Sequence, residues 1–342
     1  MDGPLRLHMN ENTAGCAPAV LEALHAVTRQ EVARYPDYDR AVAECARYLG
    51  VTPADVVLTN GLDDGLHAVA NRARTFGLAG RPEGHAFEAI VIEPAFEMFA
   101  AAAEAADGVV VRVPMAAGFA FPLDAVLAAI TPRTRLVFIN DPNNPTGQGV
   151  AAGAIEAVAA AAPHAIVFVD EAYAEFSGRT LIGPRLDRRR NLVVGRTFAK
   201  AHGLAGLRIG AVVGHADFMA RLRERQPPYH VNAFAVAALV AAIAAPDYAA
   251  WFVDQAARSR EAIYDWCRRR GLAYWPSEAN FVLVRLGPAA ADVTAAVAAR
   301  GVWIRDKSPA PGCEGCVRVA AGVVEHTERG LAVIDDALVR RP

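Results

Sequence analysis

Short apolar runs alternate with longer alanine-rich stretches through most of the chain. The runs rich in Val and Ile predict strands at residues 55–59, 89–92, 109–113, 135–139, 165–169, 191–194 and 208–213. The stretches between them predict helices at residues 63–76, 96–106, 151–162 and 215–225. Nearly continuous apolar strands separated by helices are typical of a mostly parallel sheet that is covered on both faces. We therefore expect a large α/β domain over residues 41–246.

The pattern changes after residue 246. A long helix is predicted over residues 248–270, and an arginine run followed by Gly271 is a plausible C-terminal stop. The remaining segments predict strands at 280–286, 302–305 and 317–320 and helices at 290–300 and 325–338. This order indicates a smaller α+β domain, which the N-terminal arm is expected to complete. The small domain would then consist of residues 1–40 and 247–342.

Composition narrows the class of protein. With 54% hydrophobic residues, 21% charged residues and a formal net charge of −2 over 342 residues, the chain is expected to be globular with a large core. A near-zero charge disfavours binding to nucleic-acid phosphates. The longest apolar run, residues 233–246, is shorter than the roughly 20 residues needed to cross a bilayer, and the first residues lack the apolar core of a signal peptide. We expect a cytoplasmic protein with neither nucleic-acid nor membrane partners.

The cysteines predict neither disulfides nor a metal site. There are five of them, an odd number scattered through the chain, which is not the pattern of a disulfide framework. Cys313 and Cys316 have CxxC spacing, but no second pair or nearby histidine cluster accompanies them. We therefore expect no bound metal.

The basic residues are unusually uneven. Of the 35 lysine and arginine residues, only Lys200 and Lys307 are lysines. An arginine stays protonated near neutral pH, whereas the pKa of a lysine amine can be lowered until it loses its proton. A chain that uses arginine almost everywhere else has a chemical reason to use lysine, at least at one of these two positions. Lys307 lies two residues past Arg305 without a comparable motif, and it is expected to be an ordinary exposed cation near the mouth of the substrate site.

Three loops after predicted strands contain the candidate chemistry, because ligands of open α/β sheets bind at the carboxyl ends of the strands. Residues 140–147 form a turn rich in Asn, Pro and Gly, a composition that an ordinary turn also has. Residues 170–173 begin with two acids at the end of an apolar strand, where they need a partner or a role; a helix cap or a surface salt bridge would also suffice. Residues 195–208 contain Lys200, with Thr197 and Arg208 as its neighbours.

Together these loops suit pyridoxal phosphate. A deprotonated lysine amine forms Schiff bases with carbonyls. An acid that pairs with a pyridine nitrogen, together with hydroxyl and arginine donors for a phosphate, would complete such a site.

The motifs resemble a known family. The segments NNPTG (143–147), DEAY (170–173), TFAK (197–200) and GLR (206–208) are similar to those of fold-type I, class II aminotransferases, and most similar to those of the histidinol-phosphate aminotransferases. Further segments agree in the expected order, at residues 10–12, 34–36, 58–65, 227–232, 279–281, 305–306 and 317–319. The resemblance implies a fold-type I transferase, with a mostly parallel central sheet in the large domain, a smaller α+β domain and pyridoxal 5′-phosphate as cofactor.

The resemblance also implies roles for single residues. Lys200 would bind the cofactor covalently and shuttle the proton, Asp170 would pair with the ring nitrogen, and Asn144 and Tyr173 would hydrogen-bond the ring oxygen. Phe96 would stack on the ring. The amides of Leu62 and Asp63 would hold the phosphate at a helix N-terminus, which suits an anion. The side chains of Thr197 and Arg208 would add donors, and so would Tyr35 from a second subunit, which implies a homodimer.

For the substrates, the resemblance assigns three residues. Arg318 would clamp the α-carboxylate, a task suited to a guanidinium; Arg305 stands where the family binds the phosphate of histidinol phosphate; and Asn12 would lie near the substrate. An arginine in so arginine-rich a chain can equally be an ordinary surface residue. The implied reaction is transamination between histidinol phosphate and 2-oxoglutarate, giving imidazole-acetol phosphate and glutamate in histidine biosynthesis.

The sequence departs from the family pattern beside the lysine. Ala199 replaces a usual Ser, which removes one phosphate donor, and His202 replaces a common aromatic residue. These changes leave other substrates open, namely those of an aromatic amino acid aminotransferase or of a decarboxylase of the threonine-phosphate type. A non-catalytic cofactor-binding regulator is a further alternative, which the absence of a DNA-binding extension or basic face disfavours.

Overall fold

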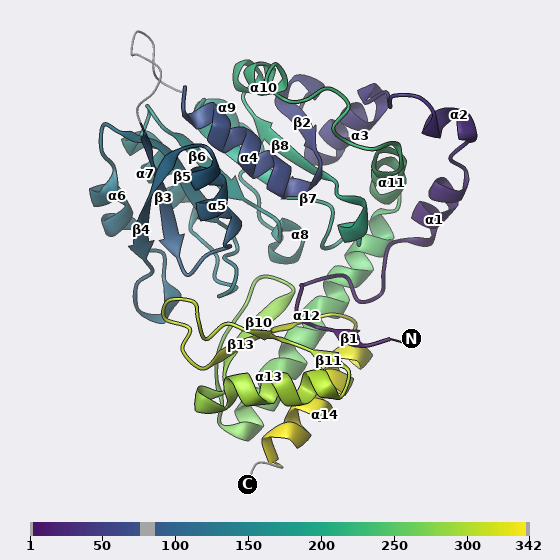
Figure 1. The fold of residues 1–342 in the computed structure, drawn as a ribbon, viewed down its shortest axis with the longest axis vertical. Helices are drawn as coiled ribbons and strands as arrows, with labels where there is room; N and C mark the ends of the chain where they lie inside the picture. The colour runs from purple at the N-terminus through teal and green to yellow at the C-terminus, as the bar shows by residue number, and fades with distance from the viewer. Residues whose placement is uncertain (1–2, 76–85, 340–342) are drawn as a thin grey trace.

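The chain folds into two units joined by one long helix. The structure is a computed structural model in which residues 3–75 and 86–339 are described. The larger unit surrounds a seven-stranded sheet and the smaller one a four-stranded sheet (Figure 1). The small unit lies beyond the carboxyl ends of β3 and β4, which point toward it in Figure 1. The space between the two units is therefore where ligands of such a sheet bind.

The large sheet is mostly parallel, as predicted. Its strand order is β2-β8-β7-β6-β5-β3-β4, with every neighbouring pair parallel except those that include β8, which is antiparallel to both β7 and β2. The strands are β2 (Val56–Thr59), β3 (Phe87–Glu93), β4 (Gly108–Pro114), β5 (Thr134–Asn140), β6 (Ile166–Asp170), β7 (Leu192–Thr197) and β8 (Gly210–Gly214). Each overlaps a strand predicted from an apolar run.

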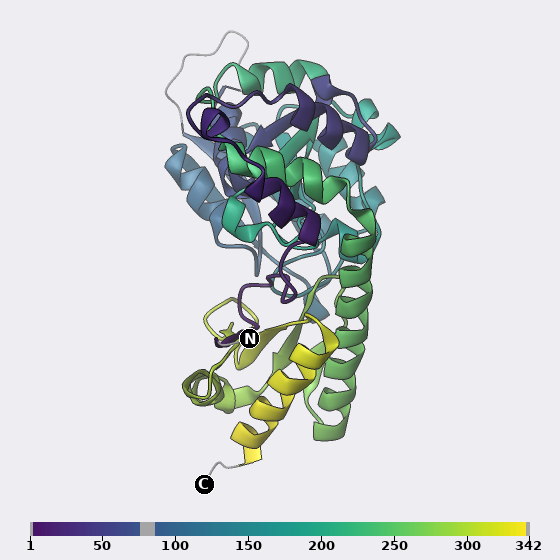
Figure 2. The same ribbon diagram turned by 90° about the vertical axis from the view of Figure 1, so that its right-hand side faces the viewer.

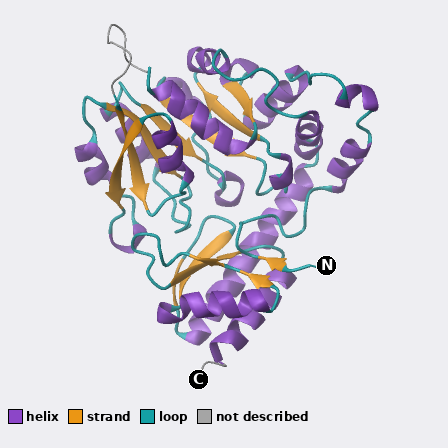
Figure 3. Ribbon diagram, viewed as in Figure 1, coloured by secondary structure: helices purple, strands orange, loops and turns teal. Residues whose placement is uncertain are grey.

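Helices cover both faces of this sheet (Figure 3). Side chains alternate along β5, so that Val137 and Ile139 pack with one core and Leu136 and Phe138 with the other. The first core includes residues of α1 (Pro18–His25), α3 (Asp39–Leu49), α6 (Leu123–Ala129), α7 (Ala152–Ala161) and α11 (Ala233–Ile243). The second includes residues of α4 (Gly61–Ala73), α5 (Met98–Ala105) and α10 (Ala216–Arg223). Short helices complete the unit: α2 (Arg29–Val32), α8 (Ala174–Ser177), α9 (Pro184–Arg188), η1 (Pro53–Asp55), η2 (Ala117–Phe119) and η3 (Ala205–Leu207).

The small unit is an antiparallel sheet with two helices packed on it. Its strand order is β12-β13-β10-β9. A separate parallel pair joins β1 to β11. The elements are β1 (Leu5–Arg6), β9 (Ala273–Trp275), β10 (Phe281–Arg285), β11 (Val302–Trp303), β12 (Arg305–Asp306), β13 (Cys316–Ala320), η4 (Gly287–Ala289), α13 (Ala290–Ala299) and α14 (Val324–Val339).

The 25-residue helix α12 (Pro246–Arg270) belongs to both cores, and Figure 2 shows it running from one unit to the other. Phe252 near its start packs in the large unit, whereas Ile263 and Cys267 near its end pack in the small one. No single helix in the described residues is long and apolar enough to cross a membrane, although α11 and α12, bent by 79° at their junction, pass that test as a pair.

The N-terminal arm divides between the two units, which corrects the expectation that all of residues 1–40 join the small one. Leu5 and Leu7 pack in the core of the small unit. By contrast, Ala17 and Val20 pack in the core of the large unit, where α1 lies against α11. The apolar residues of α1 attach this segment to the large unit. The sequence pattern predicts that they are buried, but not which of the two units they pack against.

Candidate active site

A cavity of about 380 Å³ lies where the two units meet. Its lining comes from the loops after β5, β6 and β7, from the start of α4, from the N-terminal arm and from strands of the small unit. All of the predicted site residues line it except Tyr35 and Asn12. The fold therefore gathers residues that are far apart in the sequence.

Asp170, the last residue of β6, is the buried acid of this cavity. One of its oxygens accepts a hydrogen bond from the Ala172 amide at 2.9 Å. Burial, together with the nearby negative charge of Asp63, raises the pKa of its carboxyl to about 7, although the Ala172 amide and Lys200 oppose the shift. A carboxylate with so little compensation would gain from a cation placed in the cavity.

The neighbouring acid, Glu171, points elsewhere. It accepts hydrogen bonds from the Thr180 hydroxyl and the Leu181 amide, both at 2.6 Å, and lies 3.6 Å from the Arg196 guanidinium. It does not line the cavity. Asp170 is therefore available to a ligand, whereas Glu171 is used in hydrogen bonds and an ion pair within the protein.

The loop after β5 is held by its own side chains. The Asn143 amide donates to the Pro94 carbonyl at 3.1 Å, and its oxygen accepts from the Thr146 hydroxyl at 2.9 Å. The backbone amide of Asn144 donates to the Asn140 side chain at 2.8 Å. These bonds leave the Asn144 side chain facing the cavity, where its oxygen accepts from Arg318.

Gly147 ends this loop against the small unit. It has a positive φ of 75°, and a Cβ at this position would lie 2.2 Å from the Ser277 hydroxyl oxygen. We expect Gly147→Ala to lower the free energy of unfolding by about 1–3 kcal/mol, because neither the backbone angle nor the space admits a methyl group. Denaturant titration measures this. The control is Gly153→Ala in α7, which meets nothing within 4 Å and should not be destabilised; equal effects in both variants would contradict the prediction.

Tyr173 and the N-terminal arm close another side of the cavity. The Tyr173 hydroxyl accepts a hydrogen bond from the Asn10 amide at 3.0 Å, and its ring meets Phe281 edge-on. Asn10 has a φ of 55°, and its own side-chain oxygen is buried with no hydrogen-bond partner among residues 3–75 and 86–339. The sequence analysis selected Asn12 from this segment, whereas the structure places Asn10 in the site.

Lys200 follows β7 and reaches the centre of the cavity. Its amine donates to the Met9 carbonyl at 3.1 Å. Burial, and then the positive charge of Arg318, lower its pKa to about 8. The amine is therefore close to losing its proton at neutral pH, which is what carbonyl chemistry requires.

One corner of the cavity is built like an anion site. The helix α4 begins at Gly61, so the amides of Leu62 and Asp63 belong to its first turn, where amides lack helical partners. The Arg208 guanidinium lies 2.8 Å from Asp63, and a Cβ on Gly61 would come within 2.6 Å of it. Thr197 adds a hydroxyl nearby. Gly61 is thus required for the arginine to reach this corner.

Two predicted residues are not in the cavity. Asn12 donates to the Ala201 carbonyl at 3.1 Å and accepts from the Ala14 amide at 2.9 Å, so its side chain serves the fold of the arm. Tyr35 is 78% exposed and stacks on Tyr229, with 4.3 Å between the ring centroids. Within one chain, neither lines the cavity.

Lys307 corrects the expectation of an exposed cation. It is only 9% exposed, lines the cavity, and lies 3.2 Å from the Glu97 carboxylate. Arg305 and Arg318 line the same side. The two-residue spacing from Arg305 indicated a position near the substrate, but no motif around Lys307 indicated that its side chain is buried.

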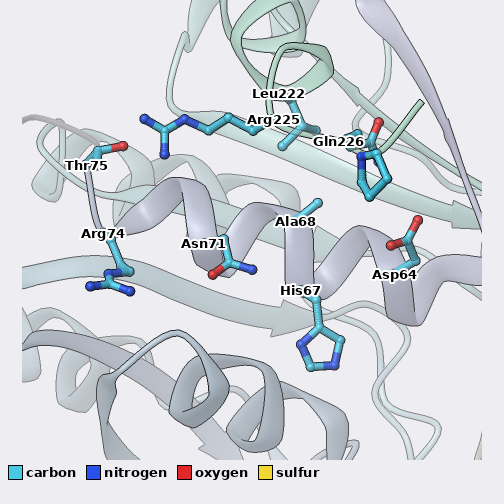
Figure 4. A pocket seen from close by; sticks show the side chains of 10 residues that line it. Asp64, His67, Ala68, Asn71, Arg74, Thr75, Leu222, Arg225 and Gln226 are labelled. Carbon is cyan, nitrogen blue, oxygen red and sulfur yellow. The ribbon is translucent and has the colours of Figure 1, made fainter. Parts of the chain in front are cut away.

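A second hollow, of about 550 Å³, lies over α4 and next to α10 (Figure 4). It is lined by polar side chains such as His67, Asn71 and Arg225 and by none of the predicted site residues. The described residues contain no group of three or more His, Cys, Asp or Glu side chains that could hold a metal ion, and Cys313 and Cys316 are buried free thiols.

Comparison with known proteins identifies the family. The family model for aminotransferases of class I and II matches residues 3–334. The chain belongs to this aminotransferase family. It is 36% identical to histidinol-phosphate aminotransferase 2 of Pseudomonas aeruginosa, over 98% of this chain and 89% of the relative. It is 34% identical to an aromatic amino acid aminotransferase of Rhodococcus opacus, over 96% of this chain and 89% of the relative.

Among solved structures, histidinol-phosphate aminotransferase from Sinorhizobium meliloti in complex with pyridoxal 5′-phosphate has a TM-score of 0.85 and 26% identity, covering 98% of this chain and 91% of that one. This aminotransferase is thus a pyridoxal-phosphate enzyme of fold type I, as its sequence motifs predict.

The residues present fit this cofactor. Within the described part of the chain, the Asp170 carboxylate accepts one hydrogen bond, from the Ala172 amide, and has no ion-pair partner, so a protonated pyridine nitrogen would supply the missing cation. The corner formed by α4, Thr197 and Arg208 offers donors to a phosphate. Lys200 lies on the wall of the same cavity, as the covalent attachment requires.

Proposed function

We propose that this aminotransferase transfers the amino group of histidinol phosphate to 2-oxoglutarate, giving imidazole-acetol phosphate and glutamate. The observation that carries the proposal is the pair Arg305 and Arg318, which line the cavity wall that belongs to the small unit. Both substrates bring anionic groups to this wall, a phosphate in one case and two carboxylates in the other. The name of the Pseudomonas relative supports the same choice.

The chain's own groups hold the cofactor in this proposal. When bound, pyridoxal phosphate supplies an electron sink for the charge that develops at the substrate Cα. The Asp170 carboxylate would stabilise a proton on the ring nitrogen, Asn144 and Tyr173 would hydrogen-bond the ring oxygen, and Phe96 would cover the ring. The first turn of α4, with Thr197 and Arg208, would bind the phosphate.

Lys200 moves the proton. Its amine, with a pKa lowered to about 8, would take the proton from the substrate Cα and hold it for return to the product. Arg318 would bind the substrate anion: the His8 carbonyl fixes its Nη2 at 2.7 Å, and its buried Nε has no hydrogen-bond partner among the described residues.

The enzyme is proposed to act as a homodimer. Exposed apolar side chains gather on the N-terminal helices and their neighbours, among them Leu21, Val32, Tyr35, Tyr229 and Phe234. Tyr35 would then reach the phosphate corner of the partner subunit. Sedimentation equilibrium should give twice the chain mass. A cytoplasmic location remains a prediction. So do the domain boundaries, with a large domain over residues 41–246, although part of the N-terminal arm packs on the large unit.

A panel of half-reactions tests the substrate. The cofactor-loaded enzyme is mixed in turn with glutamate, histidinol phosphate, phenylalanine and threonine phosphate, and the loss of its visible absorption is followed. We expect rapid bleaching by glutamate and histidinol phosphate, because these are the two amino donors of the proposed reaction and each brings an anionic group to Arg305 and Arg318. A response to phenylalanine without one to histidinol phosphate would favour the aromatic aminotransferase, and carbon dioxide release from threonine phosphate would favour the decarboxylase.

A further inference from the structure

Three cations share one face of the small sheet. Arg305 is paired directly with Arg318 across β12 and β13, so two like charges lie opposite each other. Lys307 is two residues beyond Arg305 and therefore points to the same face, and its amide continues the ladder by donating to the Cys316 carbonyl at 2.9 Å. Like charges in such positions repel, so this face is arranged to receive an anion.

The compensation available within the protein is small. Neither Arg305 nor Arg318 forms an ion pair in the described part of the chain: Arg305 contacts the Met9 sulfur, and Arg318 contacts an amide oxygen and a carbonyl. Lys307 has one counter-ion, Glu97, at 3.2 Å. The Glu97 side chain is 86% exposed, whereas that of Lys307 is 11% exposed. The carboxylate is thus free to turn into solvent while the amine stays in the cavity.

Two nearby acids, Asp306 and Glu11, do not neutralise these three cations. Asp306, on the opposite face of β12, accepts hydrogen bonds from the amide and hydroxyl of Ser308 and is used to shape the following turn. Glu11, which also lines the cavity, is paired with Arg6 at 2.8 Å. Lys307 is therefore a buried cation whose carboxylate partner, Glu97, is exposed to solvent.

We propose that Lys307 is a specificity-determining residue that binds the distal anion of the substrate, its phosphate or side-chain carboxylate, in exchange for Glu97. The inference rests on the proposed function in that the amino donors carry such an anion. With glutamate, Arg318 would hold the α-carboxylate and Lys307, beside Arg305, the side-chain carboxylate. The phosphate, which is the one anionic group of histidinol phosphate, would bind at Lys307 and Arg305. Substrates without the distal anion would leave the Lys307–Glu97 pair in place.

The test compares matched amino donors that differ in the distal anion. The holoenzyme and its Lys307→Met variant are mixed with histidinol phosphate and with histidinol, and separately with glutamate and with phenylalanine. In Lys307→Met, we expect the apparent Kd for the two anionic donors to rise about 10- to 100-fold, with the saturating rate changed by less than about threefold. For the two donors without the anion, the apparent Kd should change by less than about threefold. Lys307→Arg should restore most of the loss, and Glu97→Gln should tighten binding of the anionic donors.

Arg285→Met is the matched control. This variant removes a cation from β10 of the same sheet, where Arg285 lies over Trp275 and outside the cavity. It should not distinguish the donors. Equal weakening of all four donors by Lys307→Met would overturn the proposal, because Lys307 would then act only as a link between Glu97 of the large unit and β12 of the small one.

A binding measurement separates this proposal from the proposed function. Maleate, an unreactive dianion, is titrated into the holoenzyme, and binding is followed by the cofactor's absorption. A weaker affinity in Lys307→Met supports the role of Lys307 even if histidinol phosphate proves not to be a donor. An unchanged affinity for maleate, with histidinol phosphate still reacting normally in both proteins, rejects Lys307 and leaves the proposed function standing.

Discussion

Lys200→Ala should lower the turnover number for transamination by at least about 10⁴-fold, the largest effect of any single substitution in this enzyme. The variant loses both the amine that binds the cofactor covalently and the base that moves the Cα proton. Lys200→Arg is expected to be equally inactive, because it keeps a positive charge but has no proton that it can release near neutral pH. Single-turnover measurements with glutamate, followed at the visible absorption band, check both variants.

The composition of the chain makes the covalent assignment easy to test. Lys200 and Lys307 are the only lysines, and both line the same cavity. Borohydride reduction of the loaded enzyme should leave a pyridoxyl group on the peptide that contains Lys200, as peptide mass spectrometry would detect. Lys307→Arg should keep that label. A label on Lys307, or undiminished turnover in Lys200→Ala, would contradict the assignment.

The sequence predicts the centre of the site because its residues directly follow strands. Asp170 ends β6, and Lys200 lies just beyond β7. The carboxyl ends of parallel strands meet at one edge, so their loops converge whatever the details of packing. The same argument cannot separate Asp170 from Glu171, since only the packing of Arg196 and Thr180 against Glu171 decides which acid faces the cavity.

The residues that were missed depend on contacts between distant segments. Lys307 lies in the cavity between the two units, and its partner, Glu97, stands 210 residues earlier, at the start of α5 in the other unit. Local sequence patterns carry no information about a contact between such distant segments. Asn10 enters the site because the arm crosses the cavity with a left-handed residue, which local patterns do not reveal. Tyr35 reaches no site within its own chain, so only an assembly can give it the role that the family resemblance implies.

Asp170→Asn should have opposite effects on catalysis and on stability. In the loaded enzyme, the variant removes the anion that pairs with the ring nitrogen, and we expect the turnover number to fall roughly 10²- to 10³-fold, as for a broken buried ion pair. In the cofactor-free enzyme, the same carboxylate is buried without a cation. Its removal should therefore raise the free energy of unfolding at pH 8, by up to about 4 kcal/mol.

The pH dependence follows from the direction of the pKa shift. In the unfolded chain the Asp170 carboxyl releases its proton near pH 3.8, whereas in the folded, cofactor-free enzyme it holds the proton up to about pH 7. Between these values the folded state binds more protons, so the stability contributed by Asp170 falls as the pH rises through this window. Urea titrations of the cofactor-free proteins measure this. The free energy of unfolding should fall less between pH 5 and pH 8 in Asp170→Asn than in the parent enzyme.

Glu171→Gln is the matched control, since it alters the adjacent buried acid outside the cavity. It should bind the cofactor with an unchanged spectrum. Burial raises the pKa of the Glu171 carboxyl to about 7 as well, but Arg196, Thr180 and Leu181 all favour its carboxylate form, so we expect Glu171→Gln to gain less stability at pH 8 than Asp170→Asn. If Asp170→Asn were instead destabilised at pH 8 without cofactor, the carboxylate would have a partner in the folded chain. Asp170 would then be held for the fold, and its raised pKa would not mark a site that awaits a cation.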